Sequence, residues 1–170
     1  GIFVHEKHCK NTDLIRFAGW WGHDKSVRFK MEPQFKPMPT AEAWQLSNAP
    51  VISMACHKAS LKIFNRTNMQ QLREKSKKLT GYLDFILKDI SSRSNKVNFE
   101  VITPEQENER GCQLSILTHG QGKTLFETIS KKGVVADWRE PNVIRVAPVP
   151  LYNSFEDIYR FGQIIEHSLE

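Results

Sequence analysis

Two adjacent tryptophans, Trp20 and Trp21, stand between Gly19 and Gly22 and are followed by His23. Glycine lets a ligand or another chain segment approach the backbone closely, so a loop of this kind can present its aromatic faces to a partner. Flat indole faces beside a histidine and a basic run suit an anionic or aromatic ligand. The alternative is a core plug, because buried aromatic side chains dominate core energetics.

A second candidate is Arg145, which interrupts an apolar run that ends in two prolines, residues 144–150. A buried arginine is costly unless an anionic group pairs with it. Its planar guanidinium suits a carboxylate that is held by two parallel hydrogen bonds. The residues leave two interpretations open: a ligand carboxylate, or a structural ion pair with an acid of this chain, such as Asp137 or Glu140.

A small polar pair, Ser47 and Asn48, lies just before Pro50 and the first long helical segment. Asn48 could cap that helix, since asparagine is a favoured N-cap residue. Its amide could instead donate to a ligand. The residues alone do not choose between the two.

The sequence gives little support for a metal site or a membrane span. His5, His8 and Cys9 cluster, but no second ligand pair follows at typical zinc spacing, so we expect no metal site. The three cysteines are far apart, which disfavours a disulfide scaffold and favours a reducing, cytoplasmic location. No apolar run approaches the roughly 20 residues of a membrane span, and residues 1–5 resemble a strand rather than a signal peptide.

The chain has 170 residues and a net charge of +5, which allows an anionic partner without requiring one. Basic side chains are frequent in the helical stretch 62–88. A nucleic-acid surface would combine such a basic face with exposed aromatic side chains. The aromatic residues here, Phe64, Tyr82 and Phe85, fall at expected core positions, so we expect a solvated helix face and no nucleic-acid partner.

The elements that must position these residues can be read from the pattern. After the strand at 1–5, residues 6–50 are irregular and rich in proline. Helical periodicity runs from about 51 to 90, with a break at 65–68 where Thr67 or Asn68 would cap a second helix. Strands are expected at 97–103, around 112–116, at 134–138 and at 143–149.

A short helix around 125–129 should end near Gly133, and a last helix should begin after Ser154, with Asp157 at the capping-box position. Helices followed by a β-β-α-β-β-α series predict an α/β fold of the α+β type. In it, helices pack on one face of a small, mostly antiparallel sheet.

Together these stretches resemble kynureninase, a pyridoxal-phosphate enzyme of the aspartate-aminotransferase (type I) fold, class V aminotransferase-like. The matching stretches run in family order along the whole chain: 3–8, 19–23, 28–31, 46–50, 79–83, 109–114 and 144–155. The resemblance implies the fold of the C-terminal domain of type I enzymes. It also implies hydrolysis of L-kynurenine, or of its 3-hydroxy form, to an anthranilate and L-alanine in tryptophan degradation. The residues leave the choice between these two substrates open.

The resemblance also implies residue roles. Trp20 matches the tryptophan that contacts the cofactor phosphate, and Asn48 an asparagine near both the cofactor and the substrate ring. Arg145 matches the arginine that binds the substrate α-carboxylate, so the resemblance favours a ligand role for it. Ser47 and His23 match positions that line the aromatic pocket. Trp21 stands where other members carry a different aromatic residue, which implies a role in ring selectivity.

The family's Schiff-base lysine has no counterpart in this sequence, so no catalytic residue is assigned. The resemblance therefore implies the C-terminal part of the enzyme, inactive by itself and homodimeric in its full-length form. Residues 1–50 would be the end of the large domain and an interface loop, and residues 51–170 the small domain. The alternative is a non-catalytic interaction or regulatory domain with the same small-domain fold.

Overall fold

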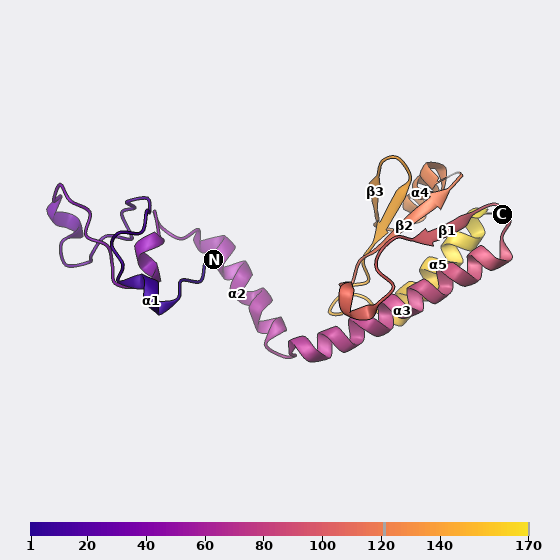
Figure 1. Ribbon diagram of the computed structural model, residues 1–170, viewed down its shortest axis with the longest axis horizontal. Helices are drawn as coiled ribbons and strands as arrows, with labels where there is room; N and C mark the ends of the chain where they lie inside the picture. The colour runs from indigo at the N-terminus through magenta and orange to yellow at the C-terminus, as the bar shows by residue number, and fades with distance from the viewer. Residues whose placement is uncertain (121, 170) are drawn as a thin grey trace. The chain divides into compact units, whose positions relative to one another are not determined.

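The computed structural model describes residues 1–120 and 122–169. The chain divides into two compact units, Gly1–Ile63 and Phe64–Glu170. The first unit is rich in loops, whereas the second contains the sheet and its helices (Figure 1). The division at residue 50 that the resemblance implies, between the end of a large domain with an interface loop and a small domain, stays a prediction.

The first unit is mostly irregular, as its prolines predict. Its elements are α1 (Glu6–Cys9), η1 (Arg28–Lys30), η2 (Ala41–Trp44) and α2 (Val51–Phe64). The strand predicted at residues 1–5 is wrong, since that segment is irregular. A strand needs a partner strand for its backbone hydrogen bonds, and none of the described residues supplies one here.

The second unit follows the predicted element order. Its elements are α3 (Met69–Arg93), β1 (Asn98–Val101), η3 (Glu107–Glu109), β2 (Leu114–His119), α4 (Gly122–Lys131), β3 (Asp137–Arg139), β4 (Val143–Val146) and α5 (Phe155–Leu169). The predicted helical break is confirmed. Asn68 caps α3, because its side-chain oxygen accepts the N–H of Gln71 at 2.9 Å.

The four strands form one sheet in the order β1-β2-β4-β3, and every neighbouring pair is antiparallel. Alternate side chains point to opposite faces of a sheet. Leu114, Ile116 and Ile144 lie on one face and share a core cluster with buried residues of α3, α4 and α5. These three helices therefore cover the same face, which confirms the predicted α+β arrangement (Figure 1).

The opposite face, called the open face below, is covered by none of these three helices. It carries the side chains of Glu100, Ser115, His119, Asp137 and Arg145, as the strand register requires. Glu100 and His119 pair across β1 and β2 at 3.0 Å. The sheet thus separates an apolar core from a polar surface on which Arg145 lies.

Three strands, β1, β3 and β4, are shorter than predicted. Val134, placed in a strand by the sequence pattern, instead donates its N–H to the carbonyl of Ile129 at 3.1 Å and so completes the end of α4. Gly133 precedes it with φ of +92°, the left-handed conformation expected after a helix. At the other end of the chain the predicted capping box is confirmed. Asp157 accepts the backbone N–H of Ser154 at 2.7 Å, and the Ser154 hydroxyl accepts the N–H of Asp157 at 3.2 Å.

Candidate functional site

The tryptophan pair is held by close backbone packing. A Cβ added to Gly19 would lie 2.2 Å from the Cα of Leu46, and one added to Gly22 would lie 2.6 Å from the carbonyl oxygen of Ala43. Any larger residue at either position would push the segment away from η2 and the residues after it. The two glycines therefore serve close approach, as the sequence indicates, although the partner is this chain's own backbone.

Arg28 is the buried centre of this loop, with 6% of its surface exposed. Its Nη2 donates to the carbonyl oxygens of Trp21 at 2.7 Å and His23 at 3.1 Å. Its guanidinium carbon lies 4.4 Å from the ring centroid of Trp21, a cation–π contact. Arg28 thereby fixes both the backbone and the indole plane of Trp21.

The indole of Trp21 in turn fixes Asn48, since its Nε1–H donates to Asn48 Oδ1. An indole nitrogen can only donate, so the asparagine must turn its oxygen toward Trp21. Its NH₂ group, with two donors, then faces away from the indole. Asn48 does not cap α2: the first helical hydrogen bond runs from Met54 N to the carbonyl of Pro50 at 2.9 Å.

The other predicted residues of the first unit vary in surroundings. Trp20 is 45% exposed and meets Phe29 edge-on, with ring centroids 5.5 Å apart. Its indole N–H has no acceptor among the described residues. The core-plug interpretation is therefore wrong for Trp20. The imidazole of His23 packs edge-on against Phe35 at 5.5 Å, whereas Ser47 is exposed.

Arg145 lies on β4, an interior strand, and its guanidinium Nη2 forms an ion pair with Asp137 Oδ2 on β3. The side chain is 31% exposed on the open face. Of the two acids that the sequence offers as partners, Asp137 is thus correct. Glu140 pairs instead with Lys123 at 3.1 Å.

The pair sits in a small charged cluster. Arg139 also contacts Asp137 Oδ2, at 3.0 Å from its Nη2. The hydrogen bond from Arg145, aided by Arg139, holds the pKa of the Asp137 carboxyl below its ordinary value. Asp137 is therefore ionised at neutral pH, and the two guanidinium groups share one carboxylate.

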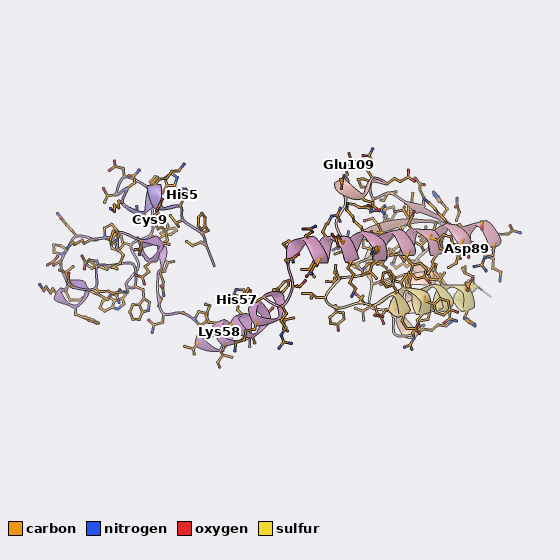
Figure 2. All side chains as sticks on the ribbon, turned by 90° about the horizontal axis from the view of Figure 1, so that it is seen from below. His5, Cys9, His57, Lys58, Asp89 and Glu109 are labelled. Carbon is orange, nitrogen blue, oxygen red and sulfur yellow. The ribbon has the colours of Figure 1, made fainter. Side chains whose placement is uncertain are left out.

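Other chemistry is not assembled by the described residues. His5 is the N-cap of the short helix α1 and Cys9 is its last residue (Figure 2). Among the described residues, no group of three His, Cys, Asp or Glu side chains could hold a metal ion. Within residues 1–120 and 122–169, no helix is long and apolar enough to cross a membrane. On α3, Lys77 and Lys88 pair with acidic neighbours, as a solvated helix face predicts. The core positions predicted for Phe64 and Phe85 are wrong, since these side chains are 49% and 64% exposed, whereas Tyr82 packs against the core.

Arg28 is the site residue that sequence reasoning missed, because it stood as one member of a basic run. No periodicity marks it, and its contacts are to backbone carbonyls of a loop. The one available signal was the position of this basic residue, seven residues after Trp21. That signal is too weak to distinguish Arg28 from its basic neighbours. The structure places the candidate residues of the first unit relative to one another. It places Arg145 relative to the other residues of the second unit.

A family model and the curated relatives both name kynureninase. A family model described as the kynureninase C-terminal domain matches residues 72–165. The kynureninase of Flavobacterium psychrophilum is 53% identical over 169 residues, which cover 99% of this chain and 40% of that protein. The kynureninase of Xanthomonas oryzae pv. oryzae is 51% identical over 168 residues, covering 96% of this chain and 38% of that protein.

Among solved structures, acetylornithine aminotransferase from Elizabethkingia anophelis is similar over 59% of this chain and 24% of its own, with 19% identity and a TM-score of 0.47. The chain spans about 40% of the length of the curated relatives it matches. The matched family model covers more than half of the sequence, including the sheet, α4 and most of α3 and α5. The chain belongs to the kynureninase C-terminal domain family.

Proposed function

We propose that this chain is the C-terminal segment of a kynureninase, a pyridoxal-phosphate-dependent hydrolase. The full-length enzyme would cleave L-kynurenine or 3-hydroxykynurenine to an anthranilate and L-alanine. The observation that carries the proposal is the end-to-end match, at 53% identity over 99% of the chain, to a kynureninase. We further propose that the full-length enzyme is a cytoplasmic homodimer.

The position of Arg145 supports a carboxylate-binding role. It lies on an interior strand of the open face, where its guanidinium is partly accessible and not walled in by helices. A planar guanidinium with free hydrogens binds a carboxylate through two parallel bonds. In the proposed reaction Arg145 would hold the substrate α-carboxylate and so orient the amino-acid end for cleavage.

The residues of the first unit suit the other ligand groups. Trp20 is 45% exposed and its indole N–H has no acceptor among the described residues, which fits a phosphate oxygen. The Asn48 NH₂ donors, turned away from Trp21, fit a carbonyl or ring substituent. His23 and Ser47 would line the aromatic pocket. Pyridoxal phosphate, when bound, would supply the electron sink for the reaction.

The test compares the 170-residue chain with the full-length enzyme. The full-length enzyme is expected to carry the Schiff-base lysine. We expect the full-length enzyme to release anthranilate and L-alanine from L-kynurenine, and the chain alone to release neither. If the full-length protein lacks such a lysine and has no activity, the result would instead support the alternative of a non-catalytic interaction domain.

Arg145→Ala in the full-length enzyme tests the site. We expect a rise in KM of at least about tenfold, since a charge-assisted bidentate contact is lost. Glu100→Gln, on the same open face but in the separate pair with His119, is a matched control that should leave KM unchanged. An unchanged KM in Arg145→Ala, with only a lowered melting temperature, would make Arg145 a structural residue.

A further inference from the structure

We propose that Asp137 is a positioning residue for Arg145, holding the guanidinium in one orientation on the open face while leaving a two-donor edge free for a carboxylate. The inference rests on the proposed function, in which Arg145 binds the α-carboxylate of the substrate. It concerns how that arginine is made ready before the substrate arrives.

The register of the sheet brings the two side chains together. Asp137 on β3 and Arg145 on β4 are direct partners, and Ser115 on β2 is the partner of Arg145 on the other side. Directly opposite residues share one face, with Cβ atoms about 5 Å apart. Because aspartate is short, Arg145 must turn toward β3 to make the contact. The ion pair therefore fixes where the guanidinium lies.

The donors of Arg145 show why the ion pair does not exclude a ligand. Arginine has five N–H donors. Asp137 takes one hydrogen of Nη2, and Nε is buried without a partner. Within the described part of the chain no acceptor contacts Nη1. One Nη1 hydrogen and the second Nη2 hydrogen remain, and together they can form the two-donor fork that a carboxylate binds.

Arg139 completes the arrangement. It contacts the same Asp137 oxygen at 3.0 Å, so the carboxylate is held from two sides. Two arginines and one aspartate leave a net charge of +1, and the cluster still attracts an anion. Arg139 is the more exposed of the two, at 59% against 31% for Arg145, so it braces Asp137 from the more solvent-accessible side.

This arrangement has a measurable consequence. An unrestrained arginine loses rotamer freedom when it binds a ligand, and prior restraint by Asp137 removes that loss. Ordering one long side chain corresponds to about a two- to tenfold change in affinity. Loss of Asp137 should therefore raise the KM for kynurenine by about two- to tenfold, with kcat changed less than twofold.

The experiment uses the full-length enzyme with Asp137→Asn, which keeps the shape and removes the charge. KM and kcat are measured for L-kynurenine, and Ki is measured for kynuramine, the analogue without the α-carboxylate. We expect the KM to rise and the kynuramine Ki to stay unchanged. Glu100→Gln, on the same open face but in the separate pair with His119, is the matched control and is expected to change KM less than twofold.

An unchanged or lowered KM in Asp137→Asn would overturn the proposal, since a lowered KM means that Asp137 competes with the substrate. Asp137→Glu keeps the charge and should return KM to within about twofold of the parent; the same loss in both variants would contradict a charge-based role. Arg145→Ala separates a failure of the positioning role of Asp137 from a failure of the carboxylate-binding role of Arg145. If it removes the preference for kynurenine over kynuramine while Asp137→Asn has no effect, only the positioning role fails. If it leaves that preference intact, the proposed role of Arg145 fails.

Discussion

Helices α3 and α5 meet at a glycine, and replacing it with alanine should destabilise the second unit. Gly162 is buried in the middle of α5, and a Cβ added there would lie 2.7 Å from Cγ2 of Ile86 on α3. Isoleucine is stiff at χ1, so Cγ2 cannot rotate away without strain. Overpacking of this kind costs about 1–3 kcal/mol.

Gly81 provides a matched control within the same pair of helices. It lies inside α3, and a Cβ added there meets nothing within 4 Å. Alanine at either position removes the flexibility penalty of a helical glycine, which stabilises the fold by about 0.5–1 kcal/mol. Because that gain is common to both, the difference between Gly162→Ala and Gly81→Ala isolates the steric cost of about 1–3 kcal/mol.

The assay is thermal unfolding of the 170-residue chain, followed by calorimetry and circular dichroism. For a unit of this size 1 kcal/mol corresponds to about 4 °C, so the melting temperatures of the two variants should differ by about 4–12 °C. Gly81→Ala should melt above the parent and Gly162→Ala at or below it. Ile86→Ala should cost less stability in the Gly162→Ala background than in the parent, because it also removes the clash. An equal rise in both glycine variants would refute the reasoning.

Three further outcomes are expected. Leu79→Ala removes a fully buried side chain from the core and should cost about 2–5 kcal/mol in urea unfolding; a loss below about 1 kcal/mol would mean that the core closes around the gap. Trp21→Phe keeps a ring but removes the donor to Asn48, whose amide could then turn and accept a hydroxyl proton. In the full-length enzyme it should raise the kcat/KM for 3-hydroxykynurenine relative to kynurenine, and an unchanged ratio would contradict the assigned amide orientation. Hydrogen bonds from Ser154 lower the pKa of Asp157, so its stabilisation is present above the ordinary carboxyl pKa and lost as pH falls through the lowered one. The Tm gap between the parent and Asp157→Asn should therefore shrink in acid, and a gap that is constant with pH would contradict the cap.

The second unit could be predicted well from sequence because its signals are periodic. Leu79, Leu83 and Leu87 recur at helical spacing and are buried in the core. Leu114 and Ile116 alternate with polar neighbours and face the same helices. Such patterns report burial against a shared core. The errors lie at element ends, where Val134 closes a helix instead of opening a strand.

The first unit could not be predicted in the same way, since its order does not come from a core. Among the described residues of the first unit, Ala43 is the only hydrophobic residue that is buried. Its contacts are those of Arg28, which donates to loop carbonyls and lies over the Trp21 indole, and those of glycines packed on backbone. These contacts join residues without periodic spacing. The pair Gly19 and Gly22 marked the loop, but nothing in the sequence identified Arg28 as its centre.

The two interpretations that the sequence allows for Arg145 are not exclusive. An ion pair with an internal acid and a contact with a ligand carboxylate exclude one another only if the guanidinium has a single binding edge. Arg145 gives one hydrogen of Nη2 to Asp137, and its outer fork remains free among the described residues. A structural partner that uses one edge makes an arginine a more selective carboxylate binder, because the orientation is set before the ligand arrives. An acid found beside such an arginine is therefore a reason to test its effect on substrate KM, not a reason to discard the ligand role.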